Sequence, residues 1–266
     1  MPHSHTKSKL CFAHIFGPVY SWRLGYSLGI DPLSAKEKVC NYDCIYCQLG
    51  RTGQLSRRRR IFVPVREMIR EVRRLPPMKI DYITFSGRGE PTLAKNLGRM
   101  IKAVRKIRPG KIAVITNGSL LYQKRVRQDL MQTDFVLVKL DACDDMFWRK
   151  INHPVGGIGY KHMLAGIKIF RRQYKGRFGL QIMLMDMNRT AVGCLADLAR
   201  LLRPDEVQLN TPLRQSPVAP LSRPLMLELA RIFKRCRVRM VYQVKRKKVK
   251  PLNVKATRYR HGKESL

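Results

Sequence analysis

Short apolar stretches and longer amphipathic segments alternate along most of this chain. The short stretches predict β-strands at 25–31, 81–87, 111–118, 135–142, 178–185 and 206–211. Between them, apolar residues recur with helical spacing, which predicts helices at 64–75, 93–107, 123–132, 162–176, 191–202 and 224–236. Such alternation indicates βαβ units and therefore a parallel sheet of the α/β class.

The number of strand–helix units limits the choice of fold. Six units are too few for a complete eight-unit barrel. A seventh strand could form at 237–244. We expect three regions, namely an N-terminal extension at 1–23, a barrel at 24–222, and at 223–266 a C-terminal helix, a possible strand and a solvated basic tail.

Polar residues occupy alternate positions in several predicted strands. Since side chains alternate between the two faces of a strand, each strand would present one polar stripe. In α/β barrels the site lies at the carboxyl ends of the strands. The polar residues near these ends are Thr84, Ser86, Asn117, Lys139, Asp141, Gln181, Gln208 and Asn210.

Three cysteines, Cys40, Cys44 and Cys47, lie within eight residues and have no fourth cysteine nearby. A structural zinc site uses four protein ligands, and a [4Fe–4S] cluster normally takes four thiolates. Three thiolates therefore favour a cluster with one iron open to another ligand. The alternative is a zinc or iron site completed by a distant residue such as His14 or Cys143.

The C-x₃-C-x₂-C spacing, with Tyr46 directly before the last cysteine, resembles the signature of the radical S-adenosylmethionine (SAM) superfamily. The similarity extends over about residues 12–225 and is strongest to a branch related to wyosine-type tRNA synthases. The partial (βα)6 TIM-type barrel of that superfamily fits the six predicted units, followed here by a short basic C-terminal extension. The stretches that carry the resemblance are 16–31, 47–52, 86–92, 139–142 and 209–212.

The resemblance implies a cofactor set and its ligands. Cys40, Cys44 and Cys47 would hold a [4Fe–4S] cluster, and SAM would chelate its fourth iron. An electron passed through the cluster would cleave SAM to methionine and a 5′-deoxyadenosyl radical. The residues expected at SAM are Tyr46 at the adenine, Ser86, Gly87, Gly89, Glu90 and Pro91 in the loop that receives the ammonium group, Thr116 and Asn117 at the ribose or carboxylate, and Asn210 as a further contact.

Lys139 and Asp141 are the candidates for catalysis on the substrate. Both belong to the polar stripe of the fourth predicted strand. A buried lysine can donate a proton or form a Schiff base. It can equally form a structural ion pair with Asp141 or Glu90.

The charge of the chain is extreme. The 266 residues contain 54 Lys and Arg against 18 Asp and Glu, which gives a net charge of +36. Arginine fills positions 57 to 60, and residues 231–263 contain 14 Lys or Arg and no acid. Such a field attracts polyanions, so RNA, and tRNA in particular, is the expected partner. An acidic protein, or a basic surface without function, are the alternatives.

The expected function is therefore radical SAM modification of RNA, with a reducing donor such as flavodoxin or ferredoxin. The alternatives are activation or modification of a protein or peptide, and an Fe–S module for electron transfer or sensing. Apolar runs never approach the length of about 18 residues needed to cross a membrane. Seven mostly scattered cysteines do not form a disulfide framework, so a reducing, cytoplasmic location and no membrane contact are expected.

Overall fold

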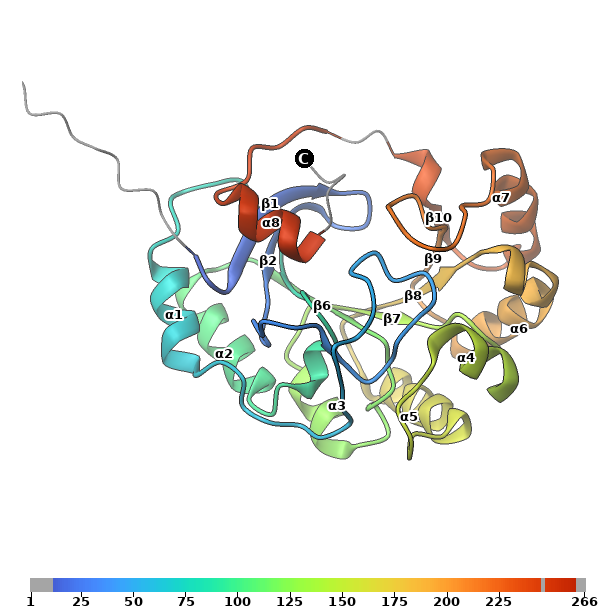
Figure 1. Cartoon of the computed structure of the whole chain (residues 1–266), viewed down its shortest axis with the longest axis horizontal. Helices are drawn as coiled ribbons and strands as arrows, with labels where there is room; N and C mark the ends of the chain where they lie inside the picture. The colour runs from blue at the N-terminus through green and yellow to red at the C-terminus, as the bar shows by residue number, and fades with distance from the viewer. Residues whose placement is uncertain (1–11, 245–246, 262–266) are drawn as a thin grey trace, which may run out of the picture.

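The computed structural model describes residues 12–244 and 247–261. Its centre is one curved sheet of eight strands in the order β1-β2-β5-β6-β7-β8-β9-β10 (Figure 1). From β2 to β10 all neighbours are parallel, whereas β1 runs antiparallel to β2. The partial (βα)6 TIM-type barrel is confirmed. The strands are β1 Ile15–Ser21, β2 Gly25–Ile30, β5 Tyr82–Phe85, β6 Lys111–Thr116, β7 Phe135–Lys139, β8 Arg177–Met183, β9 Glu206–Asn210 and β10 Val238–Met240.

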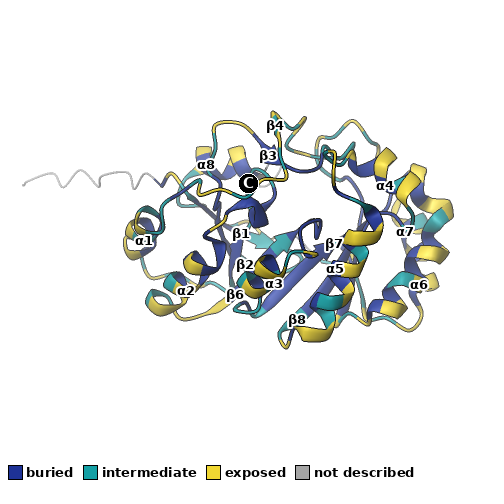
Figure 2. Ribbon diagram, turned by 90° about the horizontal axis from the view of Figure 1, so that it is seen from below, coloured by how far each residue is buried: buried dark blue, intermediate teal, exposed yellow. Residues whose placement is uncertain are grey.

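Helices α1 to α7 lie around the outside of this curve (Figure 1). Their exposed sides face outward in Figure 2, while the strands are mostly buried. In α2, for example, Met100, Ile101 and Val104 are fully buried against the sheet side. The helices are α1 Val65–Arg73, α2 Leu97–Ile107, α3 Lys124–Leu130, α4 Asp145–Asn152, α5 Tyr160–Gln173, α6 Val192–Leu202 and α7 Arg223–Ala230.

Short elements complete the connections. The chain between β2 and α1 forms a small parallel pair, β3 Val39–Cys40 and β4 Gln54–Leu55, which brackets the cysteine loop. Short 3₁₀ segments occur at η1 Pro91–Leu93, η2 Asp186–Ala191, η3 Arg231–Phe233 and η4 Val241–Gln243. Across the described ranges, no helix combines the length and apolar character required to span a bilayer.

The expected regions differ from the structure at both ends. The boundary at residues 23 and 24 falls in the turn between β1 and β2, so residues 15–21 belong to the sheet. At the other end β10 extends the sheet, and residues Val254–His261 form helix α8 beside β1 (Figure 1) rather than a solvated tail. Residues 245–246 and 262–266 of the expected tail lie outside the described residues.

The basic composition of α8 explains why the sequence pattern does not predict a packed helix there. Ala256, Thr257 and Arg260 are buried, whereas Lys255 and Arg258 are exposed. The buried Thr257 hydroxyl accepts a hydrogen bond of 2.9 Å from the backbone N–H of Gly17 in β1. A cationic side chain that is buried through an ion pair leaves no apolar periodicity in the sequence, so the pattern indicates a tail.

The open barrel is tied together at its gap by Arg239 of β10. In the described sheet the edge strands β1 and β10 are not neighbours. The Arg239 guanidinium donates hydrogen bonds to the carbonyl oxygens of Arg23 (2.9 Å) and Trp22 (2.7 Å) in the β1–β2 turn. One side chain therefore links the first and last strands of the sheet.

We expect Arg239→Met to lower the free energy of unfolding by about 1–3 kcal/mol, because it removes two hydrogen bonds from a charged donor and an ion pair of 3.9 Å with the buried Glu206 carboxylate. Urea unfolding followed by circular dichroism measures this. Arg237→Met is the matched control, because Arg237 is exposed and lies two residues earlier in the chain. Equal stability of the two variants would show that the link across the gap contributes nothing.

Candidate active site

One large cavity lies at the carboxyl ends of the parallel strands. It holds about 1130 Å³ of empty space, counting solvent at its mouth. Twelve of the residues expected from the sequence line it together, as the barrel fold requires. They are Cys40, Cys44, Tyr46, Cys47, Ser86, Gly87, Gly89, Glu90, Thr116, Asn117, Lys139 and Asn210.

The cysteine loop is held by backbone pairing at its two ends. Gln54 donates its N–H to the Lys38 carbonyl, and Ser56 to that of Cys40, both at 3.0 Å. Cys47 donates its N–H to the Cys44 carbonyl at 3.0 Å, which makes a tight turn between two of the thiols. All three cysteines are free of disulfides.

Among the described residues, no three His, Cys, Asp or Glu side chains are already grouped as a metal site. The surroundings of Cys40 and Cys44 nevertheless suit thiolate ligands. Amide groups point at two of the sulfur atoms, since Asn152 Nδ2 lies 3.3 Å from Cys44 Sγ and Asn117 Nδ2 lies 3.8 Å from Cys40 Sγ. Burial raises the pKa of both Cys40 and Cys44, so thiolates there need a compensating positive charge. A metal supplies that charge and deprotonates its thiol ligands, while hydrogen bonds to sulfur tune such clusters.

Lys38 lines the cavity beside the cysteine loop, a position that the sequence pattern does not predict. Its ammonium donates to the Gly50 carbonyl at 2.8 Å and lies 3.7 Å from Asp43. Burial alone would lower the pKa of Lys38, but the charges of Cys47, Cys40 and Cys44 outweigh burial and raise it. Lys38 therefore balances the negative charge of the cysteine loop from inside the cavity.

Glu90 is the only carboxylate among the cavity's described lining residues. The side chain of Glu90 is buried, and it accepts hydrogen bonds from Thr92 N (3.1 Å) and Oγ1 (2.6 Å), Thr116 Oγ1 (2.6 Å) and Asn117 N (2.7 Å). Burial raises the pKa of Glu90, although these donors lower it in part. Thr116 and Asn117 line the cavity, and their contacts there are with Glu90 and, for Asn117, also with Cys40 of the cysteine loop.

The loop before Glu90 needs glycine at two positions. Gly87 and Gly89 have φ of +155° and +142°, which favours glycine. A Cβ on Gly89 would lie 1.7 Å from the Val39 carbonyl oxygen, and one on Gly87 would lie 2.3 Å from the Asp31 carboxylate carbon. The loop is therefore pressed against the cysteine segment on one side and against the end of β2 on the other.

Lys139 and Asp141 meet through Tyr46. Lys139 Nζ donates to the Tyr46 hydroxyl at 2.7 Å, and that hydroxyl donates to Asp141 Oδ2. Asp141 also accepts from Met183 N (2.8 Å) and from Asn152 Nδ2 (3.1 Å). Asp141 lines a small adjoining space rather than the large cavity, so only Lys139 and Tyr46 of this hydrogen-bonded trio face the cavity.

Other expected residues lie further away. Pro91 begins η1 and is buried behind Glu90. Neither His14 nor Cys143 is among the described residues that line the cavity. Residues that the sequence analysis missed are Lys38, Asn152, Arg23, Arg214 and Arg260. The sequence pattern gives little indication of these residues, because they lie in loops or in helices far from the cysteine motif.

Comparison with known proteins identifies the family. The Radical SAM superfamily profile matches residues 38–192, from Lys38 through the cysteine loop to the start of α6. The chain belongs to the Radical SAM superfamily. Two relatives are a UPF0026 protein of Synechocystis sp., 40% identical over 78% of both chains, and a UPF0026 protein of Methanocaldococcus jannaschii, 38% identical over 75% of this chain and 63% of the other.

Solved structures share the fold at low identity. SuiB of Streptococcus suis bound to its precursor peptide superposes with a TM-score of 0.62 at 15% identity, over 80% of this chain and 47% of SuiB. An archaeal TYW1 gives a TM-score of 0.51 at 16% identity, over 79% of this chain and 72% of that protein. This radical SAM chain therefore spans about half of SuiB and shares the barrel with both.

If Glu90 receives the SAM ammonium group, as the family resemblance implies, Glu90→Gln should weaken SAM binding about tenfold or more, because the substitution removes the negative charge. Iron content should not change, because Glu90 is not one of the three cysteines expected to hold the cluster. In the wild type, SAM affinity should fall as the pH falls, because the pKa of Glu90 is raised and protonation abolishes its charge.

Equilibrium dialysis with reconstituted protein between pH 5 and 8 measures both effects. The Glu90→Gln variant should show a flatter pH profile than the wild type. A variant with wild-type affinity and the same pH profile would remove Glu90 from the SAM site.

Proposed function

We propose that this radical SAM chain cleaves SAM reductively and uses the resulting radical to modify RNA, with tRNA as the favoured substrate. The convergence of Cys40, Cys44 and Cys47 with Lys38 and Glu90 on one cavity carries this proposal. When bound, a [4Fe–4S] cluster supplies the electron that breaks the sulfur–C5′ bond of SAM, giving methionine and a 5′-deoxyadenosyl radical. A small reducing protein such as flavodoxin or ferredoxin would deliver that electron.

The chain's own residues would bind, orient and balance charge. Glu90 would receive the ammonium group of SAM, and Gly87 and Gly89 let the loop that carries Glu90 pack closely on Asp31 and Val39. Lys38 balances the negative charge of the thiolates. We assign Lys139 to the substrate side, because its ammonium faces the cavity and is fixed by the Tyr46 hydroxyl.

Anaerobic reconstitution should yield about four irons and four sulfides per chain. Cys40→Ser, Cys44→Ser or Cys47→Ser should abolish iron–sulfur absorption and the formation of 5′-deoxyadenosine. Cys194→Ser and Cys236→Ser are the controls, because neither cysteine lines the cavity. Stoichiometric zinc without iron–sulfur absorption in the wild type would refute the proposal.

The charge of the cavity and of its rim supports an anionic substrate. Five described lining residues are basic, namely Arg23, Lys38, Lys139, Arg214 and Arg260, against the single carboxylate of Glu90. Two relatives that match about a third of this chain have nucleotide-related names, which also favours an anionic substrate. A GTP 3′,8-cyclase of Stenotrophomonas maltophilia is 37% identical over 32% of this chain, and an S-adenosylmethionine-dependent nucleotide dehydratase of Lacinutrix mariniflava is 30% identical over 36%.

The arginine run after β4 divides into two kinds of residue. Arg59 is a structural residue, because it pairs with Asp129 and donates to the carbonyls of Thr92 (2.8 Å) and Ala94 (3.0 Å). Arg57, Arg58 and Arg60 are exposed on the segment that follows the cysteine loop. Arg57 donates to the Gly157 carbonyl (3.1 Å) and Arg60 donates to Gln54 Oε1 (2.7 Å), both at the surface. The three side chains would therefore be available to phosphates close to the cavity without belonging to the buried core.

A protein or peptide substrate is the second candidate. The fold shared with SuiB, whose structure contains its precursor peptide, allows it. The excess of basic residues favours RNA over an ordinary peptide, because a peptide lacks the regular array of phosphates that such a surface attracts.

Replacing Arg57, Arg58 and Arg60 together by Gln should weaken tRNA binding and reduce its salt dependence by about 0.7–0.9 in slope for each phosphate that the variant no longer binds. Wild-type affinity should fall by about 10³–10⁵ between 50 and 200 mM salt if six to ten phosphates are bound. Fluorescence anisotropy with labelled tRNA and heparin as competitor measures both.

The matched control replaces Arg99, Lys102 and Lys106 by Gln, because these exposed residues of α2 carry the same total charge on the outer face. SAM cleavage should persist in both triple variants. A flat salt response of the wild type would favour the peptide substrate. Equal reductions of affinity in both variants would indicate non-specific attraction.

A further inference from the structure

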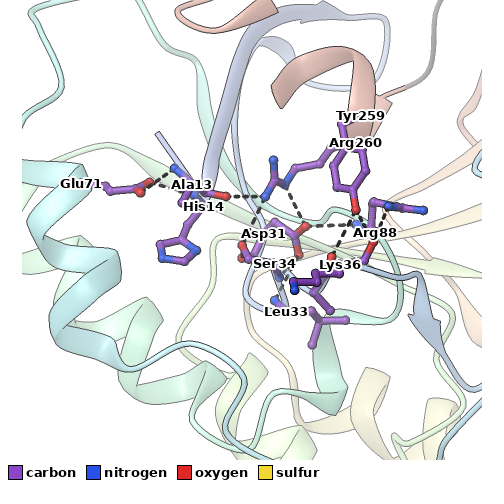
Figure 3. Close-up of polar contacts among 11 residues, drawn as sticks. Ala13, His14, Asp31, Leu33, Ser34, Lys36, Glu71, Arg88, Tyr259 and Arg260 are labelled. Atoms are coloured by element: carbon purple, nitrogen blue, oxygen red, sulfur yellow. Dashed lines mark hydrogen bonds and ion pairs between the residues drawn. The ribbon is translucent and has the colours of Figure 1, made fainter. Parts of the chain in front are cut away.

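Helix α8 reaches the loop that precedes Glu90 through one carboxylate. Figure 3 shows Asp31, at the end of β2, between Arg260 of α8 and Arg88 of the loop. The Arg260 Nε donates to Asp31 Oδ2 at 2.9 Å, and the Arg88 backbone N–H lies 3.3 Å from the same oxygen. Asp31 therefore connects the last described helix to the loop 86–91.

The Asp31–Arg260 pair is deeply buried. The exposed fractions of the two side chains are 1% and 7%. A buried ion pair costs desolvation energy, and apolar residues of the same volume can match or exceed its contribution to stability. The Asp31–Arg260 pair can instead serve to fix the relative position of β2 and α8, because both partners are held by further hydrogen bonds.

Asp31 is itself held in one orientation. Its Oδ1 accepts hydrogen bonds from the backbone N–H groups of Leu33 and Ser34, both at 3.1 Å. Arg260 also donates to the carbonyl oxygen of Ala13. The neighbouring Ala13 and His14 N–H groups in turn bind Glu71 of α1. The carboxylate thus cannot turn away from the loop without breaking several hydrogen bonds.

The loop follows the surface of this carboxylate. Gly87 comes so close to Asp31 that any Cβ would lie 2.3 Å from the carboxylate carbon. The next residue, Arg88, lies with its guanidinium 4.0 Å from the centre of the Tyr259 ring and donates to the Lys36 carbonyl at 3.1 Å. Tyr259 donates to that same carbonyl. Arg88 therefore contacts α8 directly through Tyr259, whereas Gly87 packs on Asp31, which Arg260 of α8 holds.

We propose that Asp31 and Arg260 are positioning residues that hold the Ser86–Pro91 loop in the conformation that binds SAM. Helix α8 is then part of the cofactor site, and Arg260 also faces the cavity itself. The proposal rests on the proposed SAM chemistry and adds to it two residues outside the cysteine and glycine motifs.

The test compares three variants in the full, reconstituted protein. Arg260→Met preserves much of the length of the side chain but removes its charge and donors, and should raise the dissociation constant for SAM about tenfold or more. Arg260→Lys keeps the charge and should recover part of that affinity. Arg258→Met is the matched control, because Arg258 is exposed on the same helix and should leave the constant unchanged.

Thr257→Val separates positioning from docking. This substitution removes the bond from Gly17 N that ties α8 to β1, and it leaves the ion pair in place. If Arg260 positions the loop, Thr257→Val lowers the melting temperature while SAM affinity stays close to the wild-type value. If Thr257→Val weakens SAM binding as much as Arg260→Met does, the effect comes from the docking of α8 in general, and the proposal is overturned.

The reduced cluster provides a second readout. Electron paramagnetic resonance should show the same SAM-induced change in the wild type and in Arg260→Met, but the variant should need about tenfold more SAM to reach it. Unchanged SAM affinity in Arg260→Met, with the wild type binding normally, would overturn the positioning role alone. A wild type that binds neither cluster nor SAM would overturn the proposed function, and the positioning role with it.

Discussion

The contact between Gly89 and Val39 determines how the site is assembled. The Val39 N–H donates to the Arg88 carbonyl (3.2 Å), and the Glu90 N–H donates to the Val39 carbonyl (3.1 Å). This pairing places the glycine loop directly against the residue that precedes Cys40. The Glu90 side chain then binds the end of β6 through Thr116 and Asn117. Any side chain at position 89 would clash with the Val39 carbonyl and keep these three segments apart, so the position requires glycine.

Electrostatic balance explains much of the remaining arrangement. Buried thiols, a buried carboxylate and an excess of basic side chains share one cavity. Lys38 shows how closely opposite charges can approach there, since the thiols raise the pKa of its ammonium despite burial. A cavity of this kind is suited to a bound cluster, a zwitterionic cofactor and an anionic substrate that together complete its charge balance.

Local pattern was sufficient for the sheet and for much of the cavity wall. The six predicted strands correspond to β2, β5, β6, β7, β8 and β9, and the polar stripe placed Ser86, Lys139 and Asn210 at the cavity. The residues that the sequence pattern does not predict are those whose position depends on contacts between segments far apart in the chain. Helix α4 is only eight residues long, so Asn152 beside Cys44 gave no signal. The partner of Arg260 lies 229 residues earlier, so its burial could not be read from α8 alone.

The position of α8 also affects the order in which the protein is completed. The bond between Gly17 N and Thr257 Oγ1 joins residues 240 positions apart. At synthesis rates of about 5–20 residues per second, the N-terminal hairpin waits roughly 10–50 s for the helix that covers it. During that interval the cysteine loop already exists while the end of β2 still lacks Arg260. The radical SAM barrel therefore reaches its final form only after nearly all of the described chain has been made.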